Sequence, residues 1–127
     1  MISGRVRDRF KPWGGYWILM EPDPFSPVRL GPLSLNNRFI LAAAASGGSA
    51  DENGIIVPDE ITRLSRYADE EVGLIITGAI GISDTAISQP TSSRLVTEDQ
   101  VAGFSRLCGL VHEKGGKIAA QLCHSGI

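Results

Sequence analysis

The 127-residue sequence has little of what marks several classes of protein. Its two cysteines, Cys108 and Cys123, are too few for the disulfide framework of a small secreted domain, so reduced thiols in a cytoplasmic protein are the simpler interpretation. A formal net charge of -2 gives no reason to expect nucleic acid or an anionic membrane as a partner. No apolar run approaches the roughly 20 residues that cross a bilayer, and the apolar residues 17–20 are too few for a signal peptide.

The composition is sufficient for one folded domain, preceded by an irregular N-terminal segment. An apolar fraction of 43% and a charged fraction of 20% are typical of a globular protein rather than a disordered one. Residues 1–27 are predicted to be an irregular N-terminal arm, because glycine and proline interrupt every helical or strand period there. Met20 is a second candidate start, so residues 1–19 are either a flexible arm or not native to the protein. Residues 28–127 are predicted to form the domain.

The domain is predicted to alternate strands and helices after a short hairpin. The hairpin spans residues 28–35, with a Gly-Pro break in its middle, and Asn36-Asn37 closes it. Buried strands are predicted over three short apolar runs, at residues 39–42, 72–77 and 117–121. A long loop rich in Gly, Ser, Thr and Pro is predicted over residues 78–96.

Two helices are predicted from their end signals and their apolar spacing. The first begins at Pro58, followed by two acids that complement the helix dipole, and is expected to end near Glu71. Thr97 and Gln100 match a capping box for the second helix, and Gly115 ends it. The predicted apolar faces are Ile61, Leu64 and Ala68 in the first helix, and Val101, Phe104, Cys108 and Val111 in the second.

The order β-α-β-α-β, with strands of the buried type, implies parallel strands joined by right-handed crossovers. Three parallel strands alone leave two open edges, and a closed barrel of this type needs about 250 residues. The fold class is therefore predicted to be α/β: the N-terminal part of a (β/α)₈ TIM barrel, with about three strands and two helices, preceded by a short hairpin. On this interpretation the chain is truncated and stops before the active site is complete.

The best candidate ligand site is the edge where the predicted parallel strands end, because sites gather there in this architecture. The segments 43–48, 78–84 and 121–126 are rich in small residues, which lets a flat ligand approach the backbone closely. Gln121 stands out because a polar amide ends an apolar strand, and it offers the donor and the acceptor that a pyrimidine-like edge requires. The residues alone leave open whether this amide binds a ligand or braces a loop.

The cysteines and histidines make a weak case for a metal. Cys108 and His112 share a helix face, and Cys123 and His124 follow at the next strand end, but zinc would need such ligands to converge. Cys108 falls in the predicted apolar stripe, where a buried cysteine behaves as a small hydrophobe. We therefore predict no metal site and interpret His124 as a structural hydrogen-bonding residue.

Three segments resemble successive barrel-strand motifs of the old yellow enzyme family, also called the NADH:flavin oxidoreductase/NADH oxidase family. They are Asn37-Arg-Phe-Ile40, Gly73-Leu-Ile-Ile-Thr77 and Gln121-Leu-Cys-His-Ser-Gly126. The third is the most specific, and the resemblance covers residues 25–127, the N-terminal portion of the family only.

The resemblance implies a barrel that holds FMN at its carboxyl-terminal mouth, takes hydride from NAD(P)H and passes it to an electron-poor alkene or a similar small molecule. It implies four cofactor-binding positions, with Gln121 at the pyrimidine edge of the flavin: Ala43, Ala44, Ala79 and Gln121. The family's substrate-binding pair and tyrosine proton donor lie further along. We therefore expect no catalytic residue within these 127 residues and no turnover from them alone.

Two departures from the family pattern leave the substrate type open. The family often carries Thr or Cys at the position of Ala45, whose side chain can tune the flavin, and an acid at the position of Gly78. Two other hypotheses also stand: a TIM-barrel enzyme without flavin, such as a phosphate-ligand aldolase or isomerase, or a non-catalytic truncated product that pairs through its open sheet edges. The sequence does not name the substrate, choose between NADH and NADPH, or give the oligomeric state.

Overall fold

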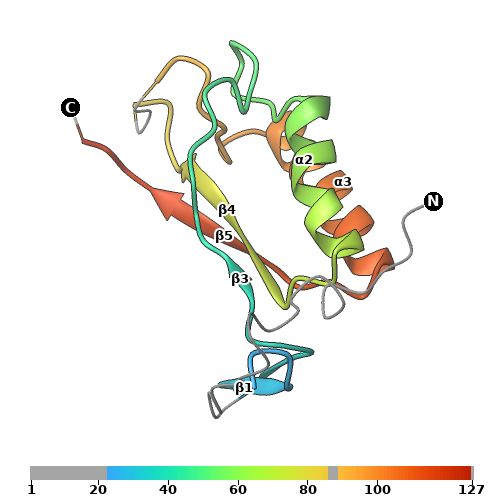
Figure 1. Cartoon of the computed structure of the whole chain (residues 1–127). Helices are drawn as coiled ribbons and strands as arrows, with labels where there is room; N and C mark the ends of the chain where they lie inside the picture. The colour runs from blue at the N-terminus through green and yellow to red at the C-terminus, as the bar shows by residue number, and fades with distance from the viewer. Residues whose placement is uncertain (1–22, 86–88, 127) are drawn as a thin grey trace, which may run out of the picture.

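The computed structural model describes residues 23–85 and 89–126, so most of the predicted N-terminal arm lies outside the described residues. The described chain begins with the predicted hairpin, in which β1 (Val28–Leu30) pairs antiparallel with β2 (Leu33–Leu35). Gly31 occupies the turn with a φ of 57°, a conformation that favours glycine. The hairpin stands apart from the main sheet, at one end of the domain (Figure 1).

The main sheet has three parallel strands in the order β3-β4-β5, as predicted. These are β3 (Ile40–Leu41), β4 (Leu74–Gly81) and β5 (Ile118–Cys123). The connecting helices, α2 (Pro58–Asp69) and α3 (Glu98–Glu113), both cover the same face of the sheet (Figure 1). The opposite face carries no helix, so the described residues form two layers with one open side.

The core lies between the helices and the sheet. The predicted face of α2 is confirmed, because Ile61, Leu64 and Ala68 are all buried. The predicted stripe of α3 is wrong in part: Phe104 and Val111 are buried, but Val101 is 43% exposed and Cys108 is only half-buried. The fully buried side chains of the core are Leu64, Ile75, Ile80, Leu107 and Val111.

The face that α3 buries is rotated because a polar residue belongs to it. Gln100 is buried, and its side-chain Oε1 accepts hydrogen bonds from the backbone N–H groups of Val96 and Thr97 at 2.8 and 3.1 Å. Its Nε2 donates to the carbonyl of Asn53 at 2.7 Å. An amide whose donor and acceptor are both used can be buried at little cost, so Gln100 replaces Val101 on the inner face and brings Leu107 with it.

The strands depart from the prediction in length and in burial. β4 continues through residues 78–81, which the Gly-rich composition had placed in a loop, because pairing with β5 outweighs the low strand propensity of glycine. The first and third strands are not fully buried: Ile40 is 48% exposed and Leu122 is 60% exposed. Both lie on edge strands with a single neighbour, so only β4 has the burial that all three were predicted to have.

A bulge divides β4 into two halves. Ile76 pairs with Ala119 and Ala79 pairs with Gln121, so two residues of β4 lie opposite one residue of β5. The Thr77 hydroxyl compensates for the interrupted ladder, because it accepts a hydrogen bond from the Gln121 backbone N–H at 3.2 Å and donates one to the Gly78 carbonyl at 2.9 Å. The extra residue puts Ile80 on the helix side of the sheet, where it is buried.

A hydrogen-bonded joint connects β3 and β4 at their amino-terminal ends. The buried side chain of Asn37 accepts hydrogen bonds from the backbone N–H groups of Phe39 and Gly73, both at 3.0 Å, and donates one to the Glu71 carbonyl at 2.6 Å. A Cβ on Gly73 would lie 2.6 Å from the Asn37 carbonyl oxygen, so only glycine fits there. Glu71 has a φ of 58°, and α2 ends two residues before it, at Asp69.

None of the helices in the described part of the chain is long and apolar enough to cross a membrane.

Candidate functional site

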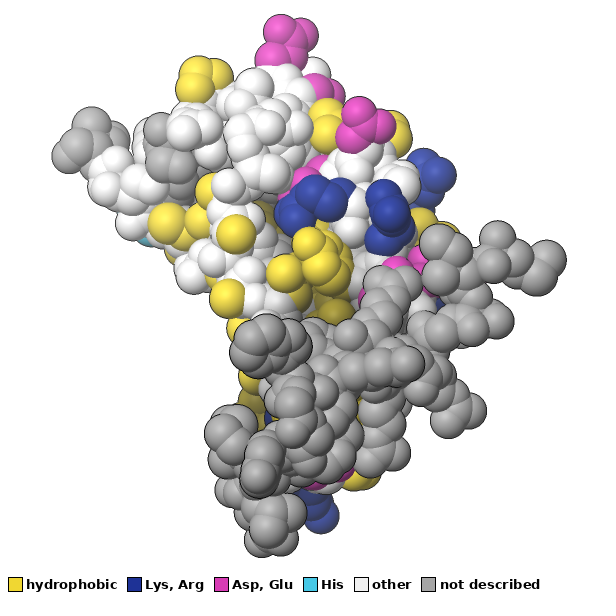
Figure 2. Space-filling view, in the orientation of Figure 1, with side chains coloured by type: hydrophobic (Ala, Val, Ile, Leu, Met, Phe, Trp, Pro, Cys, Tyr) yellow, Lys and Arg dark blue, Asp and Glu magenta, His cyan; other side chains and the backbone are white. Residues whose placement is uncertain are grey.

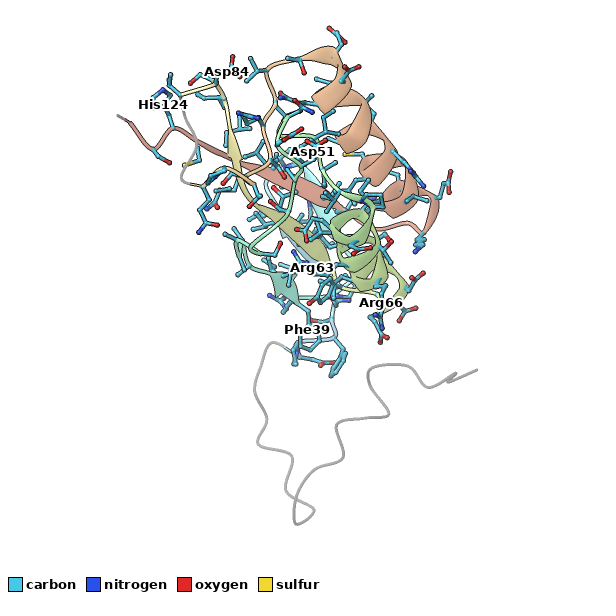
Figure 3. The ribbon with its side chains drawn as sticks, turned by 90° about the horizontal axis from the view of Figure 1, so that it is seen from above. Phe39, Asp51, Arg63, Arg66, Asp84 and His124 are labelled. Carbon is cyan, nitrogen blue, oxygen red and sulfur yellow. The ribbon has the colours of Figure 1, made fainter. Side chains whose placement is uncertain are left out.

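The segments that follow the three parallel strands meet at one edge of the sheet. β4 and β5 stay paired to their ends, where Gly81 lies opposite Cys123, and the Ile82 N–H donates to the Cys123 carbonyl at 3.3 Å. Figure 3 shows the next residues, Asp84 and His124, at the same edge of the molecule and well away from Phe39, which precedes β3. The segments that the sequence analysis singled out therefore lie near the carboxyl-terminal edge of a parallel sheet, and their role as a ligand site stays a prediction.

Gln121 and Ala79 are neighbours on the open face of the sheet. They are register partners, and Ile80, the residue after Ala79, is buried against the helices. Because successive side chains of a strand point to opposite faces, Ala79 and its partner Gln121 point away from the helices. Gln121 is exposed, and its amide group makes no hydrogen bond among the described residues. One donor group and one acceptor are therefore available beside a small residue.

The segment after β3 comes close to the same place through Gly78. A Cβ added at Gly78 would lie 2.8 Å from the carbonyl oxygen of Ala44 and 3.3 Å from the Cα of Ala45. The backbone after β3 thus rests against the backbone of β4, one residue before Ala79. In this chain a side chain at position 78, where the family often carries an acid, would push Ala44 away.

Three of the four predicted cofactor-binding positions are therefore joined by contacts. Ala44 touches the position of Gly78, and Ala79 adjoins Gly78 in the chain and pairs with Gln121. Ala43 is half-buried one residue earlier, in the same segment as Ala44. The arrangement is a shallow floor of small residues with one amide at its side, which suits a flat ligand with a polar edge.

Behind this floor, on the helix side of the sheet, lies a small cavity of about 50 Å³. It is lined by apolar core residues and by several polar side chains, namely Ser46, Ser49, Glu60, Thr77, Gln89, Ser92 and Ser93. Glu60 is the feature that the sequence did not assign to the site, because an acid in the first turn of a helix is explained by the helix dipole alone. The signal that could have found it is Arg63, three residues further along the same helix face.

Glu60 is a buried carboxylate with three hydrogen bonds. Only 7% of its side chain is exposed. Its Oε2 accepts from the Arg63 Nε at 2.7 Å and from the Ser46 Oγ at 2.9 Å, and its Oε1 accepts from the Arg63 Nη2 at 2.7 Å. Burial acts to raise the pKa of Glu60, but the hydrogen bonds from Arg63 and Ser46 outweigh it, so the pKa lies below its usual value.

The outer face of α2, beside this pair, has mixed charge. Figure 2 shows dark blue and magenta side chains interspersed over α2, and Figure 3 shows Arg63 and Arg66 projecting from it. A shallow hollow of about 460 Å³ there is lined by acids and bases together: Asp59, Thr62, Arg63, Arg66, Tyr67 and Glu70. No single charge sign prevails, so this surface offers no electrostatic selectivity for a ligand.

The lowered pKa of Glu60 predicts how the free energy of unfolding depends on pH. Because the folded-state pKa lies below the unfolded value of 4.5, the stabilisation is complete above about pH 4.5 and is lost as the pH falls through the folded-state value. We expect Glu60→Gln to lower the free energy of unfolding at pH 7 by about 1–2 kcal/mol. This loss is smaller than for a fully buried ion pair, because water reaches Arg63 and screens the interaction. The difference from wild type should shrink below pH 4.5, as measured by urea unfolding of the full-length protein.

Asp59→Asn is the matched control, because Asp59 is an exposed acid in the same turn of α2. An equal change in pH dependence from both substitutions would contradict the assignment to Glu60.

The remaining polar residues near the strand ends have local roles. The His124 Nδ1 accepts a hydrogen bond from the Gly126 N–H at 3.1 Å, in agreement with its predicted hydrogen-bonding role. Cys108 and Cys123 are both free and half-buried. Within residues 23–85 and 89–126, no group of three or more His, Cys, Asp and Glu side chains is placed to hold a metal ion.

The strand motifs and their arrangement are shared with known proteins. Residues 23–127 match the sequence model of the NADH:flavin oxidoreductase / NADH oxidase family. The chain belongs to this family. The resemblance of the three strand motifs is thereby confirmed, since the match extends over all of them.

Individual relatives give the same fold and show how much of it is present. A flavin oxidoreductase of Emericella nidulans is 33% identical over 105 residues, which are 80% of this chain and 27% of that protein. A morphinone reductase variant in complex with tetrahydroNAD has a TM-score of 0.75 and 36% identity over 83% of this chain and 28% of its own. The old yellow enzyme homologue of Zymomonas mobilis has a TM-score of 0.71 and 34% identity, with 83% and 29% covered.

The chain therefore spans less than a third of the length of these relatives. The predicted α/β fold class is confirmed: the described residues correspond to the N-terminal part of the old yellow enzyme barrel, with three parallel strands, two helices and a preceding hairpin.

Proposed function

We propose that the protein carrying this chain is an FMN-dependent oxidoreductase, which takes hydride from NAD(P)H and passes it to an electron-poor alkene or a similar small molecule. Membership of the NADH:flavin oxidoreductase family supports this proposal. So does the similarity to morphinone reductase, whose structure holds tetrahydroNAD. The chain contributes one side of the flavin site, and the observation that carries this assignment is the pairing of Gln121 with Ala79 on the open face of the sheet.

The residues present fit the flavin. An isoalloxazine ring is flat, and its pyrimidine edge has both donors and acceptors. Ala44 and Ala79 leave room for a flat ring against the backbone, and the Gln121 amide has a donor and an acceptor with no other use among the described residues. Ala43 completes the floor in the segment after β3. We therefore assign Ala43, Ala44, Ala79 and Gln121 to FMN binding.

The cofactor and the protein would have different roles in the reaction. FMN, when bound, supplies hydride acceptance and donation, and the protein supplies binding, orientation and electrostatic tuning. Gln121 would orient the pyrimidine edge, and the closely packed backbone at Gly78 would exclude water from one side of the ring. Ala45 has no side-chain donor, so its side chain contributes no hydrogen bond to this environment.

The direct test is flavin binding by the full-length protein. We expect purified full-length protein to be yellow, and Gln121→Ala to raise the FMN dissociation constant about 10–100-fold, because two hydrogen bonds to a buried ligand edge are lost. Fluorescence titration of the apoprotein with FMN measures this constant. Asn36→Ala is the control, since Asn36 is an exposed amide that precedes β3, at the opposite end of the sheet.

The outcomes separate the residue assignment from the function. Equal FMN affinities in wild type and Gln121→Ala would remove Gln121 from the site while leaving the flavin function in place. A colourless full-length protein that does not bind FMN would overturn the function itself and favour a TIM-barrel enzyme without flavin.

We also propose a cytoplasmic location, supported by the two free cysteines, which suit a reducing compartment. Fractionation of cells that express the full-length protein checks this, and recovery in the membrane or secreted fraction would contradict it.

A further inference from the structure

The segment between β3 and α2 carries two of the proposed flavin contacts but has few bonds of its own. β3 ends at Leu41, and residues 42–46 have no regular structure. Ala44 and Ala45 lie beside Gly78, where their backbone atoms occupy the space that a side chain would need. Among the described residues, the hydrogen bond from the Ser46 Oγ to Glu60 is the one side-chain hydrogen bond that residues 42–48 make. The position of this segment therefore depends strongly on one bond.

The acceptor of that bond is unusually well fixed. Glu60 sits in the first turn of α2 and is almost fully buried, and two hydrogen bonds of 2.7 Å from Arg63 hold both of its oxygens in one orientation. A carboxylate held by one bidentate pair of hydrogen bonds to a guanidinium has little rotational freedom. The remaining direction of Oε2 points at Ser46, so the rigid helix sets where Ser46 lies.

Ser46 lies only two residues from Ala44. An extended chain advances about 3.3 Å per residue, so fixing Ser46 confines Ala44 to within roughly 7 Å of a rigid point. Gly78 limits the segment from the other side, because the Ala44 carbonyl lies 2.8 Å from where a Cβ on Gly78 would be. The segment is therefore held between β4 and the start of α2, and each contact acts on a different end of it.

We propose that Glu60 and Arg63, through Ser46, position the segment that carries Ala43 and Ala44 against the flavin. Glu60 and Ser46 are thus positioning residues rather than catalytic ones, since neither is argued to touch the cofactor. This inference rests on the proposed flavin function, which it deepens by extending the site to the helix side of the sheet.

The test compares two serines of the same loop in the full-length protein. Ser46→Ala removes the bond to Glu60, and Ser46→Thr keeps the hydroxyl. Ser49→Ala is the matched control, because the Ser49 hydroxyl donates to the Thr91 carbonyl at 3.4 Å, and Ser49 is not bonded to Glu60. We expect Ser46→Ala to raise the FMN dissociation constant about 10-fold and to shift the visible flavin spectrum and the flavin reduction potential. Ser46→Thr should restore them, and Ser49→Ala should leave them unchanged.

A second measurement tests how firmly the segment is held in the apoprotein, without flavin. Amide hydrogen exchange at residues 43–45 of the apoprotein should be at least several-fold faster in Ser46→Ala than in wild type or Ser49→Ala. Faster exchange together with weaker FMN binding supports the positioning role. Equal effects of Ser46→Ala and Ser49→Ala, or no change in exchange or in the flavin spectrum, would overturn it while the flavin function stands. A wild-type protein that binds no FMN would overturn both.

Discussion

Asn37→Ala should lower the free energy of unfolding of the full-length protein by about 3–5 kcal/mol, a large share of the stability of most domains. The Asn37 side chain accepts from the N–H groups of Phe39 and Gly73 and donates to the Glu71 carbonyl, and it is buried. Alanine replaces none of these three bonds, so two backbone donors and one carbonyl lose their partners in a site that water reaches poorly. Urea unfolding followed by circular dichroism measures the loss.

The neighbouring asparagine provides the control. Asn36 is exposed, so Asn36→Ala should change the free energy of unfolding by less than about 0.5 kcal/mol. Similar losses from the two substitutions would mean that the joint at Asn37 contributes no more than a surface residue does. FMN affinity of the folded Asn37→Ala fraction should stay near that of wild type, because the joint lies at the end of the strands opposite to the proposed flavin site.

Gly78→Ala should have the largest effect on the proposed flavin site. Its Cβ would lie 2.8 Å from the Ala44 carbonyl oxygen, which is backbone and cannot rotate away. The segment after β3 must therefore shift, at a cost of about 1–3 kcal/mol in stability. A displacement of about 1 Å in a positioning element costs on the order of 100-fold in kcat/KM. Steady-state kinetics and FMN titration of the full-length protein measure both consequences.

Gly109 serves as the control, because alanine should stabilise the protein at this position rather than destabilise it. It lies inside α3, and a Cβ added there meets nothing within 4 Å. Gly109→Ala should therefore raise the free energy of unfolding by about 0.5–1 kcal/mol, because alanine favours a helix interior. A Gly78→Ala protein with wild-type kinetics, or one in which both alanines act alike, would show that the Ala44–Gly78 contact can relax without consequence.

Much of the fold could be predicted because local signals and burial agree. The Gly-Pro break, the Pro58 helix start and the glycine after α3 each act within a few residues, and all mark real boundaries. Two of the failures share one physical cause, which is competition from tertiary contacts. β4 runs through two glycines because β5 pairs with it, and α3 buries Gln100 in place of Val101 because Asn53 and two N–H groups satisfy its amide. Neither partner is visible from the segment's own residues.

The candidate site, too, could be predicted in part from local sequence and in part not. The sequence indicated which edge of the sheet carries the segments of small residues. It placed Gln121 at the end of its strand, however, whereas β5 continues to Cys123 because it stays paired with β4 as far as Gly81. The role of Gln121 as a ligand residue stays a prediction. The bulge could not be predicted, and it is the bulge that brings Ala79 rather than Gly78 opposite Gln121. The role of Gly78 depends on a backbone 34 residues earlier in the chain, and the bond between Ser46 and Glu60 joins residues whose separation carries no periodic signal.

The two ends of the sheet are held by different interactions, so substitutions at the two ends should have different effects on the protein. At the amino-terminal end, the Asn37 joint consists of hydrogen bonds between fixed partners, whereas at the opposite end the segment after β3 is held by packing against Gly78 and one serine hydrogen bond. Substitutions at the first end should reduce how much folded protein a cell accumulates without altering each surviving molecule. Substitutions at the second end should leave abundance closer to normal and alter what each molecule does, so natural variants at the two ends would be subject to different selection.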